Sequence, residues 1–136
     1  MNTLSNGTTT IALPDDLIWT DEHGYSPVRQ SVTPTIGGAL WIDVSVLSAG
    51  QPITLQAGRD DEGYPYALMT RAQFAQLRVW ADQPGQVFTL TYNGNSYDVI
   101  WRHEAPPALD ATDLIDYPDP EPTDFVIVTL RFTRVI

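Results

Sequence analysis

Residues 69–102 constrain the fold most, because they predict a capped helix followed at once by a tight hairpin. Thr70 and Gln73 have the spacing of a capping box, in which each side chain bonds the backbone amide of the other residue. Apolar residues then recur at helical spacing until Pro84 and the glycine after it, a pair that ends helices. The stretch therefore predicts one helix over residues 71–83.

Asn93 and Gly94 predict the turn of a β-hairpin between strands at residues 87–92 and 95–102. An Asn-Gly pair readily adopts the two positive φ angles of a type I′ turn, whose twist matches that of antiparallel strands. We therefore expect the helix to pack across an antiparallel sheet that contains this hairpin.

Strict alternation of apolar residues predicts two further strong strands. In residues 39–47 one face carries an apolar row and the other face carries Trp41. In residues 125–134 the apolar row faces the core. The rows are Leu40, Ile42, Val44 and Val46 in the first strand and Val126, Val128, Leu130 and Phe132 in the second. With weaker signals, among them residues 28–33, the chain holds about seven or eight strands and one helix, which predicts a mostly β fold, either a β-sandwich or a small barrel.

Two segments lack this patterning. Residues 1–10 are polar, and we expect a flexible N-terminal arm there. Residues 104–124 hold seven acidic residues, five prolines and no basic residue, which predicts a long, extended, solvated loop. The remaining pattern predicts a single β-sandwich domain over residues 11–136 that carries this loop.

Composition excludes several classes of function. The formal net charge is -10, so the chain lacks the basic surface that binds nucleic-acid phosphates. It has no cysteine, which excludes disulfides and thiolate metal sites. The N-terminus has no signal-peptide pattern and no apolar run reaches about 18 residues, so we expect synthesis in the cytoplasm and no membrane span.

No residue pattern predicts catalysis. His23 and His103 lie far apart in the sequence, and His103 followed by Glu104 is typical of a histidine at the rim of a strand. A hydrolase triad needs a nucleophile in a recognisable setting, and the chain has no Gly-x-Ser-x-Gly elbow. Two glycines at 37–38 predict a turn rather than a phosphate-binding loop. We predict no catalytic residue and no cofactor.

Three adjacent acids, Asp60, Asp61 and Glu62, sit in a loop bounded by glycines. Carboxylates could contribute to a calcium site, but their spacing does not match an EF-hand loop. We therefore interpret them as solvated loop acids and predict no metal site.

The four tryptophans give one alternative function. Exposed aromatic rings on a β-sandwich can form a platform on which sugars stack, so a carbohydrate-binding module is the alternative from another class. We expect Trp80 and Trp101 to lie in the core where the helix meets the sheet. Trp41 faces away from the apolar row of its strand, which favours a subunit interface, where tryptophan is enriched.

Several phrases of the chain resemble a known group of proteins. These are Leu13 to Glu22, Gly50 to Gln56 (GQPITLQ), Thr70 to Arg78 (TRAQFAQLR) and Pro84 to Leu90 (PGQVFTL), which is followed by the short hairpin. In order and character they resemble the small minor tail proteins of long-tailed bacteriophages and related prophages. The resemblance covers about residues 11–134. It implies the plan of distal-tail and tail-tube proteins, a β-sandwich flanked by one helix.

The resemblance also implies a function. Such proteins are structural, non-enzymatic virion components that form rings, often hexameric, at the distal tail or baseplate. A tail-tube or tail-terminator subunit is the close alternative. The implied partners are further copies of the chain and other tail proteins, namely the tube, the hub and the tape measure, with DNA passing through the lumen without specific binding. The implied location is the tail of the virion, after synthesis in the host cytoplasm.

The acidic charge agrees with a tail that conducts DNA, because an acidic lumen repels phosphates. We therefore expect some of the acids at 60–62 and 104–124 to face a lumen or a neighbouring ring.

Overall fold

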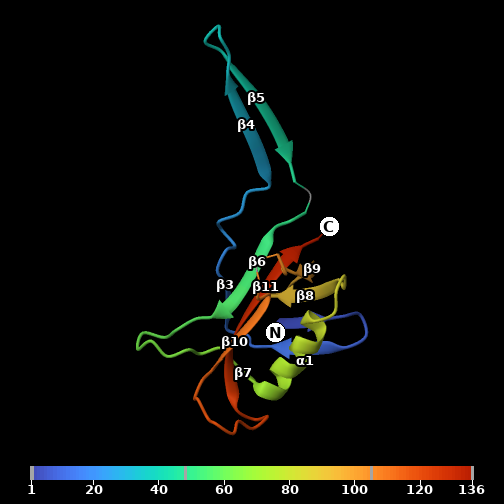
Figure 1. Cartoon of the computed structure of the whole chain (residues 1–136), viewed down its shortest axis with the longest axis vertical. Coiled ribbons are helices and arrows are strands. Elements are labelled where there is room, and N and C mark those ends of the chain that lie inside the picture. The colour runs from blue at the N-terminus through green and yellow to red at the C-terminus, as the bar shows by residue number, and fades with distance from the viewer. Residues whose placement is uncertain (1, 48, 105, 136) are drawn as a thin grey trace.

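The computed structural model describes residues 2–47, 49–104 and 106–135, and shows a compact body from which one hairpin projects (Figure 1). The described residues form eleven strands and one helix, so the predicted mostly β fold with one flanking helix is confirmed, with more strands than expected. In chain order the elements are β1 Asn2–Ser5, β2 Thr10–Leu13, β3 Leu17–Trp19, β4 Val28–Pro34, β5 Leu40–Val46, β6 Pro52–Ala57, β7 Leu68–Thr70, α1 Arg71–Ala81, β8 Phe88–Tyr92, β9 Asn95–Trp101, β10 Leu109–Asp113 and β11 Phe125–Arg134.

Strand β11 is the centre of the body sheet, because it pairs with four other strands. Its first half pairs with β7 and β10, and its second half pairs with β6 and β9, all antiparallel. The longest path through the sheet runs β2-β1-β8-β9-β11-β6-β3. The sheet curls, since the Tyr92 hydroxyl on β8 donates a hydrogen bond of 2.9 Å to the Leu17 carbonyl on β3.

The core follows the alternation of β11. Val126, Val128, Leu130 and Phe132 are all buried, as the sequence predicted. Aromatic rings continue this core from the helix to the sheet, with centroids 5.4 Å apart for Trp80 and Phe88, 6.3 Å for Phe88 and Trp101, and 4.5 Å for Trp101 and Phe132. The predicted core positions of Trp80 and Trp101 are therefore confirmed.

The helix and the hairpin after it form as their local signals indicate. Thr70 and Gln73 make the reciprocal bonds of a capping box at the start of α1. The helix ends at Ala81, two residues before the expected end, and Asp82 follows it as the C-cap. Asn93 and Gly94 have φ angles of 48° and 83°, which confirms the turn between β8 and β9.

The expected flexible N-terminal arm at residues 1–10 is wrong for Thr10, which begins β2, and for residues 2–5. These residues form β1, which pairs with β2 on one side and β8 on the other, and Leu4 is fully buried. The polar composition of the segment concealed one apolar residue that anchors it. The Asn2 side chain also donates to the Pro14 carbonyl at 3.1 Å, which fixes the end of the strand.

The acidic segment at 104–124 is not wholly a loop, and this expectation also needs correction. Residues 109–113 form β10, which pairs with β11 in register from Leu109 opposite Leu130. The pairing buries Leu109, although acids occupy other positions of the same strand. Residues 114–124 remain irregular, and residue 105 lies outside the described residues.

Phe88 gives a test of the aromatic core. Its side chain is buried against Trp80 and Trp101, so we expect Phe88→Ala to lower the free energy of unfolding by about 3–5 kcal/mol, measured by urea denaturation. The neighbouring Val87 is 53% exposed, and Val87→Ala should stay within about 0.5 kcal/mol of the original chain. Equal effects of the two substitutions would contradict this core.

Candidate functional site

Strands β4 and β5 form a separate hairpin that projects from the body (Figure 1). We call residues 28–46 the arm. Its strands pair antiparallel from Val28 opposite Val46 to Pro34 opposite Leu40, and every residue of both strands is exposed. The sequence predicted both strands, but the structure places them outside the body sheet.

The two faces of the arm differ in chemistry, because side chains alternate along a strand. One face, which we call the apolar face, holds a single polar side chain, Gln30, among seven apolar ones: Val28, Val32, Pro34, Leu40, Ile42, Val44 and Val46. The six aliphatic side chains on it are between 46% and 72% exposed. The opposite, mixed face holds Arg29, Ser31, Thr33, Trp41, Asp43 and Ser45.

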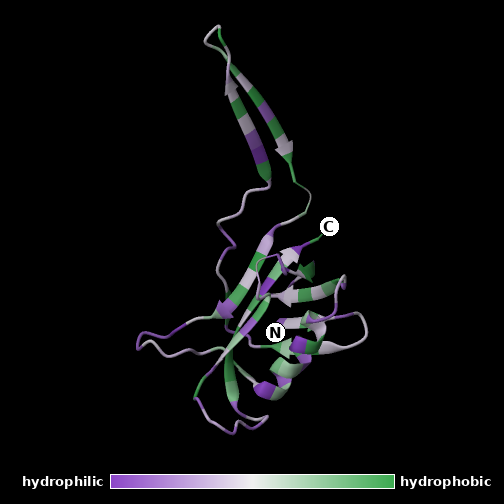
Figure 2. Ribbon diagram, viewed as in Figure 1, coloured by the Kyte–Doolittle hydropathy of each residue, from purple (hydrophilic) through white to green (hydrophobic). Residues whose placement is uncertain are grey.

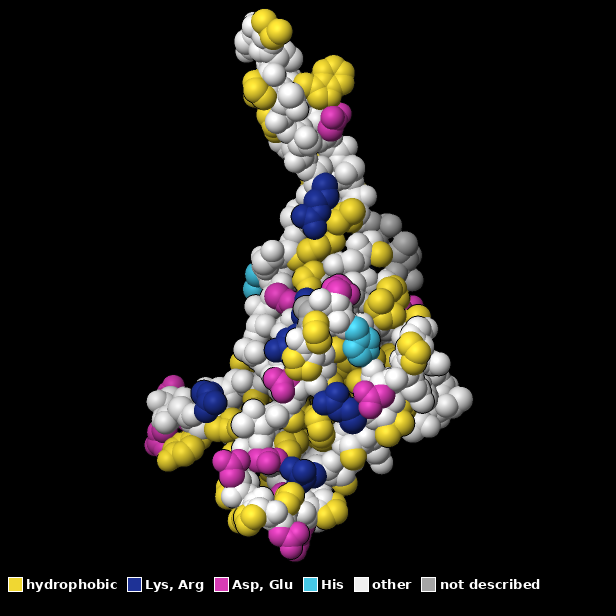
Figure 3. Space-filling model, viewed as in Figure 1, with side chains coloured by type: hydrophobic (Ala, Val, Ile, Leu, Met, Phe, Trp, Pro, Cys, Tyr) yellow, Lys and Arg dark blue, Asp and Glu magenta, His cyan; other side chains and the backbone are white. Residues whose placement is uncertain are grey.

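Such a face indicates an interaction surface. The alternation appears as hydrophobic bands along the arm in Figure 2, and Figure 3 shows several separate hydrophobic side chains exposed on it. A two-stranded hairpin alone is marginally stable in water, and a contiguous exposed apolar patch marks a site of association. We therefore identify the apolar face of the arm as the candidate functional site.

A polar network fixes the segment that leads into the arm. The Asp21 carboxylate accepts hydrogen bonds from the Thr54 amide at 3.0 Å and from the Thr54 hydroxyl at 2.8 Å. Arg102 donates to the same hydroxyl at 2.6 Å. These bonds tie the segment that leads into the arm to β6 and to Arg102, the residue after β9.

The returning segment is held by Arg134. Its carbonyl accepts from the Gly50 amide at 2.9 Å, and its own amide donates to the Gln51 carbonyl at 2.8 Å. Its guanidinium lies 5.0 Å from the centre of the Tyr97 ring. Tyr25, Pro27, Leu47, Ala49, Gln51 and Arg134 line a hollow of about 340 Å³ at the base of the arm.

A second hollow lies beside the helix, between α1, β10 and residues 120–122, with a volume of about 720 Å³. Both of its arginines already have partners in the chain. Arg71 forms an ion pair of 2.6 Å with Asp113, and Arg78 donates to the Leu109 carbonyl at 3.1 Å. These two contacts hold the helix against β10, so we interpret this hollow as part of the packing between the two elements.

The structure does not assemble the candidate catalytic residues into a site. His23 is exposed and lies 3.7 Å from Glu22, while His103 follows β9 on the body and makes no ion pair among the described residues. The carboxylate of Asp60 accepts from the amides of Glu62 and Tyr64, so it caps its own turn. In residues 2–47, 49–104 and 106–135 no group of three or more His, Asp or Glu side chains is placed to hold a metal ion.

Trp41 differs from the other three tryptophans. It is 64% exposed on the mixed face of the arm, whereas Trp19, Trp80 and Trp101 are buried. Its indole N–H donates to the Asp43 carboxylate at 3.1 Å. It is also the only aromatic residue of the arm, so the arm offers no row of rings for a sugar.

Comparisons with known proteins identify no relative of this chain, so the functional argument rests on the geometry. No protein-family model matches the chain, and no curated protein or solved structure matches it. Within the part of the chain that the structure describes, no helix has the length and apolar character needed to cross a membrane.

The arm gives a prediction about stability, because its side chains do not contribute to the core. We expect Ile42→Ser combined with Val44→Ser to leave the free energy of unfolding of the dilute chain within about 0.5 kcal/mol. Val128→Ser, at a fully buried position of β11, should lower it by more than about 2 kcal/mol. Urea denaturation followed by tryptophan fluorescence measures both, and a large loss in the arm variant would show that the arm packs on the body.

Proposed function

We propose that this protein is a non-enzymatic structural component of a bacteriophage tail, a ring-forming subunit of the distal tail or baseplate. The observation that supports self-assembly is the uncovered apolar face of the arm, which a neighbouring subunit would cover. The phage context rests on the phrases that resemble minor tail proteins, together with the sheet and single helix that the resemblance implies.

The energetics favour assembly through several contacts rather than one. Fully burying a valine, leucine or isoleucine is worth about 1.5–3 kcal/mol, and the arm residues are roughly half exposed, so each would contribute on the order of 1 kcal/mol. Six such residues give on the order of 6 kcal/mol, while association costs about 4–15 kcal/mol. A single arm contact is therefore weak. A closed ring, in which every subunit makes two contacts, is favoured over a dimer.

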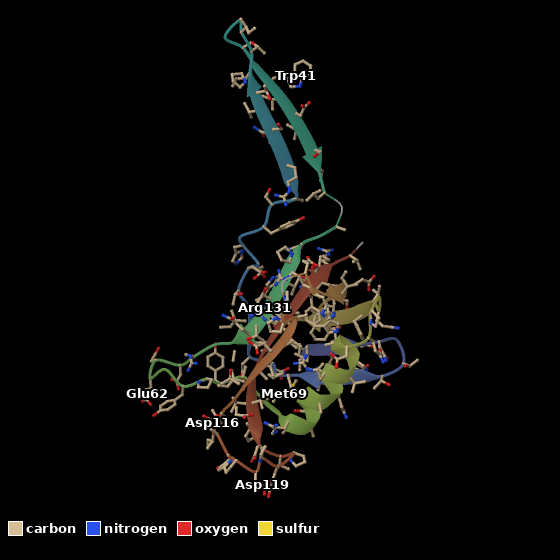
Figure 4. All side chains as sticks on the ribbon, in the orientation of Figure 1. Trp41, Glu62, Met69, Asp116, Asp119 and Arg131 are labelled. Carbon is tan, nitrogen blue, oxygen red and sulfur yellow. The ribbon has the colours of Figure 1, made fainter. Side chains whose placement is uncertain are left out.

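The distribution of charge supports the same arrangement. The arm carries one arginine and one acid, Arg29 and Asp43, so its net charge is zero while the whole chain carries -10. Interfaces are depleted of charge at their centre. In Figure 4, Glu62, Asp116 and Asp119 lie on loops at the other end of the molecule from Trp41. We propose that such loops face a lumen or a neighbouring ring, where their charge would repel DNA.

Two other functions remain distinct proposals. A tail-tube or tail-terminator subunit would use the same arm at another position in the tail. A carbohydrate-binding module would need an exposed aromatic platform, and the burial of Trp19, Trp80 and Trp101 favours the structural role over it.

Immunogold electron microscopy tests the location. An antibody against the recombinant chain should label the far tip of the tail in particles from the culture that supplies the gene. Label at the neck or along the shaft would move the protein to terminator or tube while keeping it in the virion. Unlabelled particles whose mass spectrum also lacks the chain would refute the proposal.

Charge reversal tests the acidic loops. We expect phage carrying Asp61→Lys and Glu62→Lys together to eject DNA several-fold more slowly, because a more basic lumen would retain phosphates. Asp60 is kept, since its carboxylate caps the turn of the loop. Ejection is followed by the fluorescence of a DNA-binding dye after the receptor is added. Asp16→Lys with Asp98→Lys, at exposed positions whose carboxylates make no hydrogen bond within the described residues, is the matched control. Equal ejection rates for both variants would count against a lumen position for residues 60–62.

A further inference from the structure

Both edges of the arm are open. Strand β4 pairs with β5 and, in the described chain, neither strand pairs with a third one. An unpaired edge presents backbone donors and acceptors that can bind the edge of another strand. The arm therefore offers two seven-residue edges that run in opposite directions.

The direction of the free backbone groups follows from the hydrogen bonds at the two ends of the arm. The Thr35 amide donates to the Ala39 carbonyl, and the Leu47 amide donates to the Pro27 carbonyl, both at 2.8 Å. Bonded and non-bonded pairs alternate in an antiparallel ladder. Odd-numbered residues therefore bond within the arm, and even-numbered residues direct their backbone groups outward.

The outward-directed groups belong to the residues of the apolar face. On β5 these are Leu40, Ile42, Val44 and Val46, each with a free N–H and C=O. On β4 they are Val28, Gln30, Val32 and Pro34. Pro34 has no N–H to offer, and the Val28 amide donates to the Ser26 hydroxyl at 3.3 Å. The β5 edge is thus complete. The β4 edge lacks a donor at Pro34, next to the tip, and at its other end the Val28 amide would exchange the Ser26 hydroxyl for a strand partner.

Charge decides which edges fit together. Arg29 lies on β4 and Asp43 lies on β5, both on the mixed face, and the described residues of the chain show no ion pair between them. Joining two β5 edges would bring two copies of Asp43 to one seam, and joining two β4 edges would do the same with Arg29. Opposite charges across strands stabilise a pair and like charges destabilise it. The arm therefore fits an unlike edge.

We propose that β5 of one copy pairs antiparallel with β4 of a second copy, with Asp43 opposite Arg29 of that copy. This deepens the proposed function and rests on it. In this register the three bonded pairs are Val44 with Val28, Ile42 with Gln30, and Leu40 with Val32. All six residues direct their backbone groups outward, and Pro34 stays outside the ladder. Asp43 and Arg29 form a non-bonded pair, where opposite side chains are closest.

The contact is heterologous, because each copy uses a different edge on each side. Repetition of such a contact produces a closed ring or an open filament rather than an isolated dimer. All arms then point the same way, and their apolar faces join into one continuous band on one side of the new sheet. Side chains of the bonded pairs lie next to each other across the seam, so each arm covers part of the apolar face of its neighbour.

A charge exchange tests the seam. We expect Arg29→Asp alone and Asp43→Arg alone to weaken self-association about tenfold, because each places like charges at the seam. An equal mixture of the two variants should recover the original assembly, since each seam again joins opposite charges. Native mass spectrometry of the full chain measures all three samples. If the mixture stays as dissociated as the single variants, or if Arg29→Asp alone has no effect, the pairing of unlike edges is wrong.

A proline substitution tests the backbone edge. Val44→Pro removes an outward N–H and leaves the bonds within the arm intact, whereas Val44→Ala keeps that N–H. We expect Val44→Pro to weaken association at least tenfold more than Val44→Ala. Equal association of the two variants would show that the edge is not used.

The apolar face variant separates this inference from the proposed function. If Ile42→Ser with Val44→Ser abolishes assembly while Val44→Pro and the charge variants assemble normally, the ring proposal stands and the edge pairing falls. If the original chain remains monomeric at every concentration and instead binds phosphatidylcholine vesicles through the apolar face, the occupant is lipid and both proposals fail.

Discussion

The body depends on the pairing of one strand, β11, with four others. Because it joins β7 and β10 at one end and β6 and β9 at the other, a single alternation of residues places its apolar side chains under the whole sheet. Phe132 is the clearest example, since its ring reaches Trp101 and continues through Phe88 to the helix. A shift of β11 by one residue would turn this row to solvent and leave the helix without a partner.

The arm shows the opposite result of the same pattern. Strand β5 alternates as strictly as β11, yet its apolar side chains are exposed and those of β11 are buried. Alternation determines which residues share a face, and tertiary structure determines whether that face is covered. In the body the helix and the curled sheet form a second layer that covers β11. Strands β4 and β5 project from the body, and no other described element covers them.

This difference sets how far the sequence could predict the molecule. Local signals sufficed for the capping box at Thr70 and the turn at Asn93, because each rests on contacts within a few residues. The strand at residues 125–134 was predicted from its strict alternation, although its partners are distant in the sequence. Strand β1 was missed because its stability comes from pairing with the distant β8. The arm was predicted as two strands, but its exposure depends on the path of the chain before and after it, including residues 20–27 and 49–51, which carry no periodic signal.

The same physical terms explain why the arm suits assembly better than the rest of the surface. Two copies that each carry a net charge of -10 repel each other where their bodies meet. In 0.1 M salt this repulsion decays over a distance of about 10 Å. The arm is neutral and extends beyond the body, so its contacts form where that repulsion is weakest. Its apolar face gives attraction without direction, and its open edges add direction through hydrogen bonds. An apolar patch of equal area on the acidic body would also attract a second copy. It would not separate the charged bodies, and it would not fix the orientation of the contact through hydrogen bonds.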